Sequence, residues 1–161
     1  MTEVERIVQE YDRVMDGSSA WHGDPVWIIL DSVSAECAAH RPIAEAHTIW
    51  EIVLHMTFWE GMGARRLAGQ AAGLDDDEAL NFPAPPATTD ANWLKTRDAF
   101  RASNQEFREA LTKLDAARLD ELSAARKRSF YDEAHGVIQH NVYHAGQIAL
   151  LKKSLSLRYQ I

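Results

Sequence analysis

The chain has 161 residues, of which 46% are apolar and 25% are charged, and its formal net charge is −7. This length and composition are ordinary for a soluble globular protein with a sizeable core, so we expect residues 1–161 to form a single domain. The acidic balance and the lack of a Lys/Arg cluster disfavour a nucleic-acid-binding surface, and no apolar run approaches the roughly 20 residues that a membrane span needs.

The first forty residues carry three predicted helical segments. Apolar residues at helical spacing over residues 4–15, followed by a polar stretch that contains a glycine, predict a first helix. Residues 25–30 predict a second, shorter helix, with Asp24 as its cap and Pro25 at its first helical position. Residues 32–39 are expected to add a further helical turn.

A long helix is predicted from residue 46 to residue 70, because its apolar residues form one wide face. Residues 71–88 show no periodicity and include Pro83, Pro85 and Pro86, which cannot continue a helix. Such a long connection is unusual in a compact domain. Two roles are open for it: a wall or lid over a binding site, or a solvated crossover between two distant helices.

The C-terminal half predicts two more long helices. Thr89 or Asp90 caps one that reaches about residue 114, residues 119–122 suggest a short helical turn, and residues 131–154 predict the last helix. No stretch shows the alternation that is typical of a strand. Four long helices joined by long connections predict an all-α fold, a four-helix bundle with a long crossover connection.

Two histidines near the middle of the last predicted helix share one face. His140 and His144 are four residues apart, so their imidazoles lie one turn above each other and can reach the same metal ion. The zinc-protease helix motif uses the same spacing, but Asn141 stands where that motif has its general-base glutamate. Because such a pair also arises by chance, a metal site needs a third ligand from another helix.

His55 is the candidate for that third ligand. It lies inside an apolar stripe near the middle of the helix predicted over residues 46–70, where burying an unpaired imidazole would be costly. Packing of the two helices along each other would bring it to the depth of His140 and His144. Three neutral imidazoles with open positions suit zinc, nickel or another divalent transition metal. The alternative is three core histidines, each bonded to a backbone carbonyl or a tyrosine.

Three more residues are candidates for orienting the imidazoles from behind. Glu51 lies one turn before His55, and Tyr143 and Gln147 lie next to the histidine pair in the sequence. For Glu51, a solvated charge near the helix start is an equal alternative. The other histidines are given other places: His47 at the helix start as a cap, His135 on a different helix face, and His22 and His40 on the surface.

Cysteine usage and the N-terminal residues bear on location. The single cysteine, Cys37, permits no internal disulfide, which fits a reducing cytoplasm. The acidic N-terminal residues lack an apolar core, so we expect no signal peptide and a cytoplasmic protein. Residues 125–128 form the only short basic run, and we expect a solvated loop there.

Two motifs together resemble a known family. His47-Thr48-Ile49-Trp50-Glu51-Ile52-Val53-Leu54-His55, followed far downstream by His140-Asn141-Val142-Tyr143-His144-Ala145-Gly146-Gln147-Ile148, is similar to the DinB/YfiT-like superfamily over nearly the whole chain. The resemblance implies a four-helix bundle with a long crossover and a metal held by three histidines. Those ligands correspond to His55, His140 and His144. It also implies a homodimer.

The activity implied by the resemblance is less specific. Some relatives are metal-dependent transferases or isomerases that use a low-molecular-weight thiol such as mycothiol, bacillithiol or glutathione. Two classes of function therefore stay open: a metal enzyme that activates a water or a thiol for a small-molecule substrate, and a non-catalytic metal or small-ligand binding protein of the stress response. Arg65, Arg66 and Arg101 are the candidates for binding a thiol cofactor's carboxylates, and we expect each to be a solvated helix-surface residue.

Overall fold

The computed structural model describes residues 1–17, 20–70, 78–123 and 128–156. The described chain is helical, in the order α1 (Glu3–Met15), α2 (Val26–Asp31), α3 (Ala35–Ala39), α4 (Ile49–Leu67), α5 (Glu78–Asn81), α6 (Asp90–Thr112), the 3₁₀ turn η1 (Ala116–Arg118) and α7 (Phe130–Ser156). No strand occurs in the described ranges, where Leu122 and Ser129 form a single isolated bridge. The prediction of an all-α fold is confirmed. The basic run at residues 125–128 lies mostly outside the described residues.

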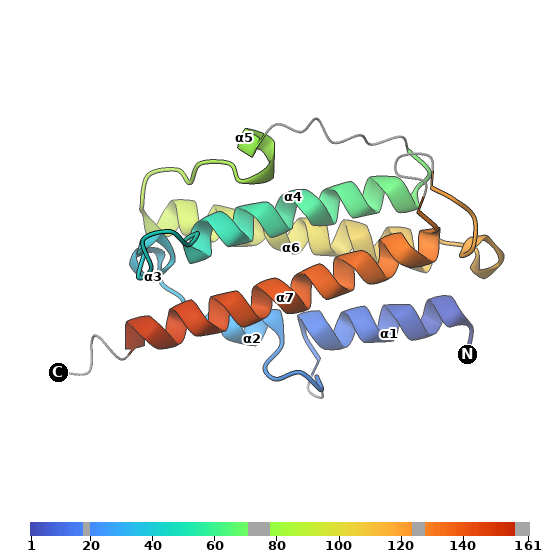
Figure 1. Ribbon diagram of the computed structural model, residues 1–161, viewed down its shortest axis with the longest axis horizontal. Coiled ribbons are helices and arrows are strands. Elements are labelled where there is room, and N and C mark those ends of the chain that lie inside the picture. The colour runs from blue at the N-terminus through green and yellow to red at the C-terminus, as the bar shows by residue number, and fades with distance from the viewer. Residues whose placement is uncertain (18–19, 71–77, 124–127, 157–161) are drawn as a thin grey trace.

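The long helices α1, α4, α6 and α7 form the bundle (Figure 1). Helix α4 packs against α6 and α7, and α1 packs against the same two helices from the other side. Helices α4 and α6 both begin at the end of the bundle where α3 lies, whereas α1 and α7 begin at the opposite end (Figure 1). The connection from α4 to α6 must therefore return along the whole bundle, which confirms the long crossover.

Side-chain caps fix where the long helices begin. Thr48 and Glu51 form a reciprocal capping box at the start of α4, and the Thr89 hydroxyl accepts the Asn92 N–H at the start of α6. Helix α4 is shorter than predicted, because Thr48 caps it and Gly69, at φ 79°, turns the chain out of the helix after Leu67.

Two local predictions were wrong. Asp24 does not cap α2: Pro25 has an extended ψ of 158° and is itself the capping position, and its carbonyl accepts the Ile29 N–H. The turn predicted at residues 119–122 lies earlier, at Ala116–Arg118, because the Asp115 carboxylate accepts the Ala117 N–H and starts the 3₁₀ turn there.

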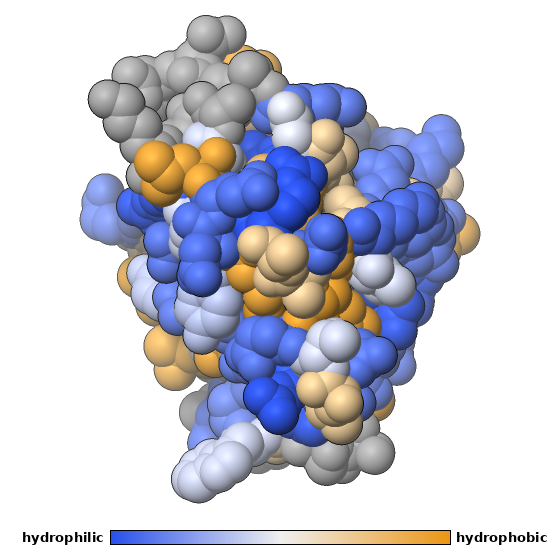
Figure 2. Space-filling view, turned by 90° about the vertical axis from the view of Figure 1, so that its right-hand side faces the viewer, coloured by the Kyte–Doolittle hydropathy of each residue, from blue (hydrophilic) through white to orange (hydrophobic). Residues whose placement is uncertain are grey.

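One end of the molecule shows a largely hydrophilic surface (Figure 2). Figure 2 views the molecule from the end where α1 and α7 begin, and hydrophobic surface forms a band between hydrophilic side chains there. Within the described ranges, no helix combines the length and the apolar character that crossing a lipid bilayer requires.

Gly63 allows α4 to approach two neighbouring helices closely. A Cβ at this position would lie 2.7 Å from Val137 Cγ2 on α7 and 2.9 Å from Phe107 Cε2 on α6. We expect Gly63→Ala to destabilise the protein by about 1–3 kcal/mol, since overpacking exceeds the gain in helix propensity. Gly61→Ala is the matched control on the same helix: its Cβ meets no heavy atom within 4 Å, so it should stabilise by up to about 1 kcal/mol. Urea denaturation measures both, and a stabilised Gly63→Ala would contradict the close approach.

Candidate metal centre

The structure brings the three predicted histidines together between α4 and α7. His55 Nε2 lies 2.9 Å from His140 Nε2, which lies 3.1 Å from His144 Nε2. His55 and His144 are buried, at 6% and 5% exposure, and His140 is partly exposed. In the part of the chain that the structure describes, these three form the one group of three or more His, Cys, Asp or Glu side chains with the spacing of metal ligands.

The other ring nitrogens fix the protonation of two of these imidazoles. His55 Nδ1 lies 2.7 Å from the Asn81 carbonyl oxygen, which accepts only, so this Nδ1 carries the proton. His144 Nδ1 likewise donates to the Gln147 amide oxygen at 2.6 Å. Neutral His55 and His144 therefore both present an Nε2 lone pair toward His140.

A count of protons shows what the cluster lacks. His140 can donate one proton from Nε2, so it can satisfy one of its two neighbours and leaves the other lone pair opposed. Among the residues that the structure describes, the buried His140 Nδ1 has no hydrogen-bond partner, so the ring gains nothing from the other tautomer. A cation among the three Nε2 atoms would resolve the opposition. Metal–nitrogen distances of about 2.0–2.1 Å at angles between right and tetrahedral separate such nitrogens by about 2.8–3.4 Å, and the two spacings from His140 Nε2, 2.9 and 3.1 Å, agree.

Burial keeps the three rings neutral. It lowers the pKa of His140 to about 3, with the neighbouring His144 and His55 adding to the shift. Burial also lowers the pKa of His144 to about 4, although the hydrogen bond that its ring donates to Gln147 opposes the shift, and burial lowers the pKa of His55. Because an imidazole binds metal only in its neutral form, all three are ready ligands near neutral pH.

The residues predicted to orient the imidazoles differ in what they do. Gln147 contacts His144 directly, as described above. Tyr143 is exposed, and its ring meets the His144 ring edge-on with centroids 5.0 Å apart. The Glu51 carboxylate is engaged at the helix start, where it accepts the Thr48 N–H at 2.7 Å and pairs with Arg41 at 2.7 Å. These two contacts at the helix start occupy the Glu51 carboxylate, which was a candidate for orienting His55.

Asn81, whose backbone carbonyl orients His55, was not predicted from the sequence. Its side-chain oxygen also accepts the Trp59 Nε1–H at 3.0 Å, which fixes α5 over α4. The Phe82 ring stacks on His55, with centroids 4.0 Å apart and planes at 4°. Residues 78–88 therefore both connect the helices and form a wall over His55. Residues 71–77, which include Asp75, Asp76 and Asp77, lie outside the described residues, and opening of this loop as a lid stays a prediction.

The remaining histidines lie apart from this cluster. His47 does not cap α4, a role that Thr48 takes; its ring stacks on the other side of Phe82 at 3.7 Å between centroids. His135 Nδ1 lies 3.8 Å from a Glu10 carboxylate oxygen. His22 is exposed, and His40 ends α3.

Arg66 is not the solvated residue that the sequence suggested. Only 3% of it is exposed, its guanidinium lies 3.4 Å from the Glu133 carboxylate, and it stacks over the Trp59 ring at 5.6 Å from the centroid. Arg65 is exposed as predicted, and the exposed Arg101 stacks over the Trp27 ring at 4.0 Å from its centroid.

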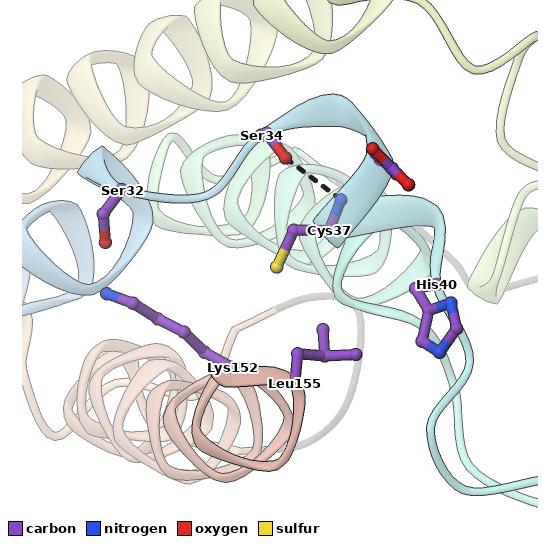
Figure 3. A pocket seen from close by; sticks show the side chains of 7 residues that line it. Ser32, Ser34, Cys37, His40, Lys152 and Leu155 are labelled. Carbon is purple, nitrogen blue, oxygen red and sulfur yellow. Dashed lines mark hydrogen bonds between the residues drawn. The ribbon is translucent and has the colours of Figure 1, made fainter. Parts of the chain in front are cut away.

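The only cysteine lies in a separate hollow between α3 and α7 (Figure 3). This hollow measures about 430 Å³ and is lined by Cys37, Lys152 and two serines, among others. Burial raises the pKa of the Cys37 thiol, although the Lys152 ammonium acts against the shift. Lys152 Nζ donates to the Ile29 carbonyl at 2.9 Å. The thiol is therefore protonated near neutral pH and lies outside the histidine cluster.

Gln147 offers a direct test of ring orientation. We expect Gln147→Ala to weaken metal binding by about 10–100-fold, because the His144 Nδ1–H loses the acceptor that fixes its tautomer and its rotation. Tyr143→Phe, one turn away on α7, is the control and should leave metal affinity unchanged. Competition titration against a chromophoric chelator measures both variants, and equal affinities for all three proteins would contradict the role of Gln147.

The geometry defines a class of protein: a four-helix bundle with a buried three-histidine cluster suited to one metal ion. A family model described as the DinB superfamily matches residues 21–148, and the chain belongs to this family. The family assignment made from the two histidine motifs is therefore confirmed. Searches of curated proteins and of solved structures each returned no match to the chain.

Proposed function

We propose that the chain binds one divalent transition-metal ion, zinc or nickel, through the Nε2 atoms of His55, His140 and His144. The observation that carries the proposal is the opposition of lone pairs at 2.9 and 3.1 Å, which the available protons cannot relieve. Family membership supports the same assignment.

The residues around the cluster prepare it for this role. Gln147 and the Asn81 carbonyl hold two of the rings with their Nε2 atoms directed inward, so little reorganisation accompanies binding. Phe82 covers one face of His55 and limits the access of water from that side. Once bound, the ion would supply Lewis-acid chemistry, which lowers the pKa of a water or a thiol that approaches it.

The function that this centre supports best is the metal-dependent transfer of a low-molecular-weight thiol to a small electrophilic substrate. The partly exposed His140 leaves one side of the cluster accessible. The second candidate is a non-catalytic metal or small-ligand binding protein of the stress response. One observation favours it: in the described part of the chain, the group with the spacing of metal ligands consists of His55, His140 and His144 and includes no carboxylate that could act as a general base.

The test uses protein purified without a histidine tag, as prepared and after loading with zinc or nickel. Elemental analysis should find about one ion per chain. Consumption of a thiol with an electrophilic haloarene should then require the ion. Stoichiometric metal with no metal-dependent turnover, over a panel of thiols and electrophiles, would favour the binding protein; absence of metal would overturn the centre itself. Assembly as a homodimer stays a prediction that sedimentation equilibrium tests.

A further inference from the structure

A pocket of about 220 Å³ opens beside the histidine cluster, and His140 forms part of its wall. Trp59 of α4 and Val137 of α7 also line it, so the end near His140 is aromatic and apolar. Most pockets for drug-sized ligands measure about 300–1,000 Å³, so this one suits the end of a small molecule.

The side of the pocket away from His140 is charged. Arg66 and Glu133 line it, but they are buried and pair with each other at 3.4 Å, so their charges offset within the protein. Two exposed charges are left: Arg128, just before α7, and Asp132, in its first turn. Across the described ranges, neither of these two side chains takes part in an ion pair.

The Asp132 carboxylate has an additional structural task. One of its oxygens accepts the Ser129 N–H at 3.4 Å, and the Ser129 hydroxyl accepts the Asp132 N–H at 3.1 Å. This local exchange caps the start of α7. It uses one carboxylate oxygen and leaves the other to contact a cationic group in the pocket.

A glycine keeps the path between the charged and aromatic ends open. Asp132, Gly136 and His140 are successive residues four apart, so they lie along one face of α7. A Cβ at Gly136 would meet no heavy atom within 4 Å. A second hollow of about 410 Å³ shares Arg128, Asp132 and Gly136 with the first and extends it outward. The face is thus a continuous groove, and eight residues of helix make it about 12 Å long.

We propose that this groove binds a molecule with a zwitterionic amino-acid head group. Its carboxylate contacts Arg128, its ammonium contacts Asp132, and its chain passes over Gly136 so that the opposite end reaches His140. The two charges of opposite sign favour this end group over a simple anion, which Asp132 would repel, and over a simple cation, which Arg128 would repel. The proposal rests on the proposed function, because the bound molecule is the thiol substrate of that reaction. It places an amino-acid group on this thiol, at a distance of about two helical turns from the sulfur atom.

The test compares probes that share a chain length and differ in end groups. The full probe is α-amino-ω-mercapto-octanoate; ω-mercapto-octanoate lacks the ammonium, and ω-amino-heptanethiol lacks the carboxylate and keeps the spacing from ammonium to sulfur. Binding is read from the visible absorption of Co(II)-loaded protein and from calorimetry on the metal-free protein. We expect the full probe to bind at least tenfold more tightly than either analogue in both measurements. Equal affinities for the three probes would overturn the proposal.

Matched variants separate the head-group contacts from the metal. Arg128→Gln should abolish the advantage of the full probe over ω-amino-heptanethiol. Asp132→Asn, which keeps an oxygen for the helix cap, should abolish the full probe's advantage over ω-mercapto-octanoate. Retained selectivity in either variant contradicts the assignment of that residue. Gly136→Leu should weaken all three probes while Co(II) stays bound, and Gly146→Leu on the same helix, where a Cβ also meets nothing within 4 Å, should not.

The outcomes distinguish the two proposals. Failure of the wild type to retain Co(II) contradicts the metal centre, and the calorimetric preference among the probes still decides the head-group site. Retention of Co(II) with equal probe affinities contradicts the head-group site alone.

Discussion

Replacing His144 by alanine should abolish tight metal binding, with a loss of affinity of at least about 100-fold. The remaining two imidazoles come from different helices, and a site with two protein ligands holds a divalent ion far less firmly than one with three. His144 Nε2 is the atom that closes the cluster against His140, at 3.1 Å. Equilibrium dialysis against zinc or nickel measures the loss.

Thermal unfolding gives a second measurement that is independent of any packing loss in the variant. A ligand that binds only the folded state, present at about 100 times its dissociation constant, stabilises it by about 2.7 kcal/mol. The wild type should therefore melt higher when metal is added, and His144→Ala should show no such rise. His135→Ala is the control on the same helix, since His135 lies beside Glu10 and outside the cluster. An equal metal-dependent rise in His144→Ala and the wild type would show that His144 is not a metal ligand, and no rise in either protein would favour three core histidines.

Helical periodicity carried most of the fold prediction, and it also located the cluster. The spacing of His140 and His144 is a property of one helix, so it is visible in the sequence. His55 was found because it interrupts an apolar stripe. Neither argument could give the rotation of α4 about its axis relative to α7. That rotation brings the Nε2 atoms of His55 and His144 each within hydrogen-bond distance of His140 Nε2.

The partners of the cluster were harder to predict. Asn81 acts on His55 through its backbone carbonyl. Every residue has such a carbonyl, so the residue type at position 81 does not predict this contact. Asn81 also belongs to a segment without periodicity, far along the chain from His55. For Glu51 the sequence left two roles equal, orienting His55 or standing as a charge near the helix start, because both fit its residue type. In the structure its carboxylate contacts Thr48 and Arg41 at the helix start.

Glu60 shows that a signal can be present and still be missed. It follows Val53 and Met56 at helical spacing, so its carboxyl group falls on the buried stripe of α4, and the structure confirms that it is fully buried. Asn141 Nδ2 donates to Glu60 Oε1 at 2.5 Å, and the Tyr11 hydroxyl lies 3.0 Å from Oε2. Because these partners come from α7 and α1, only the assembled bundle shows how the carboxyl group is satisfied.

Replacing Glu60 by glutamine should make stability less dependent on pH. Burial raises the pKa of Glu60 to about 8, although hydrogen bonds from Asn141 and Tyr11 oppose the shift. Between the unfolded value near 4.5 and this folded value, unfolding releases a proton that the folded protein holds, so the free energy of unfolding falls as pH rises. The slope is about 1.4 kcal/mol per pH unit, so the wild type should lose about 2–3 kcal/mol relative to Glu60→Gln between pH 5 and pH 7.

The difference between the two proteins isolates this carboxyl group. The lowered pKa values of His140 and His144 also make stability depend on pH below neutrality, but in the same way in both proteins. Glutamine can keep both contacts, since its side-chain oxygen accepts from Asn141 and its amide N–H donates to the Tyr11 oxygen. The Tyr11 hydroxyl then donates its own proton to the Asn104 carbonyl, which lies 3.3 Å away. The exposed Glu106→Gln is the control and should track the wild type at every pH. The free energy of unfolding is measured by urea denaturation from pH 5 to pH 8. If it changes with pH in the same way in Glu60→Gln and the wild type, Glu60 is ionised in the core, and Asn141 and Tyr11 have to stabilise a full negative charge.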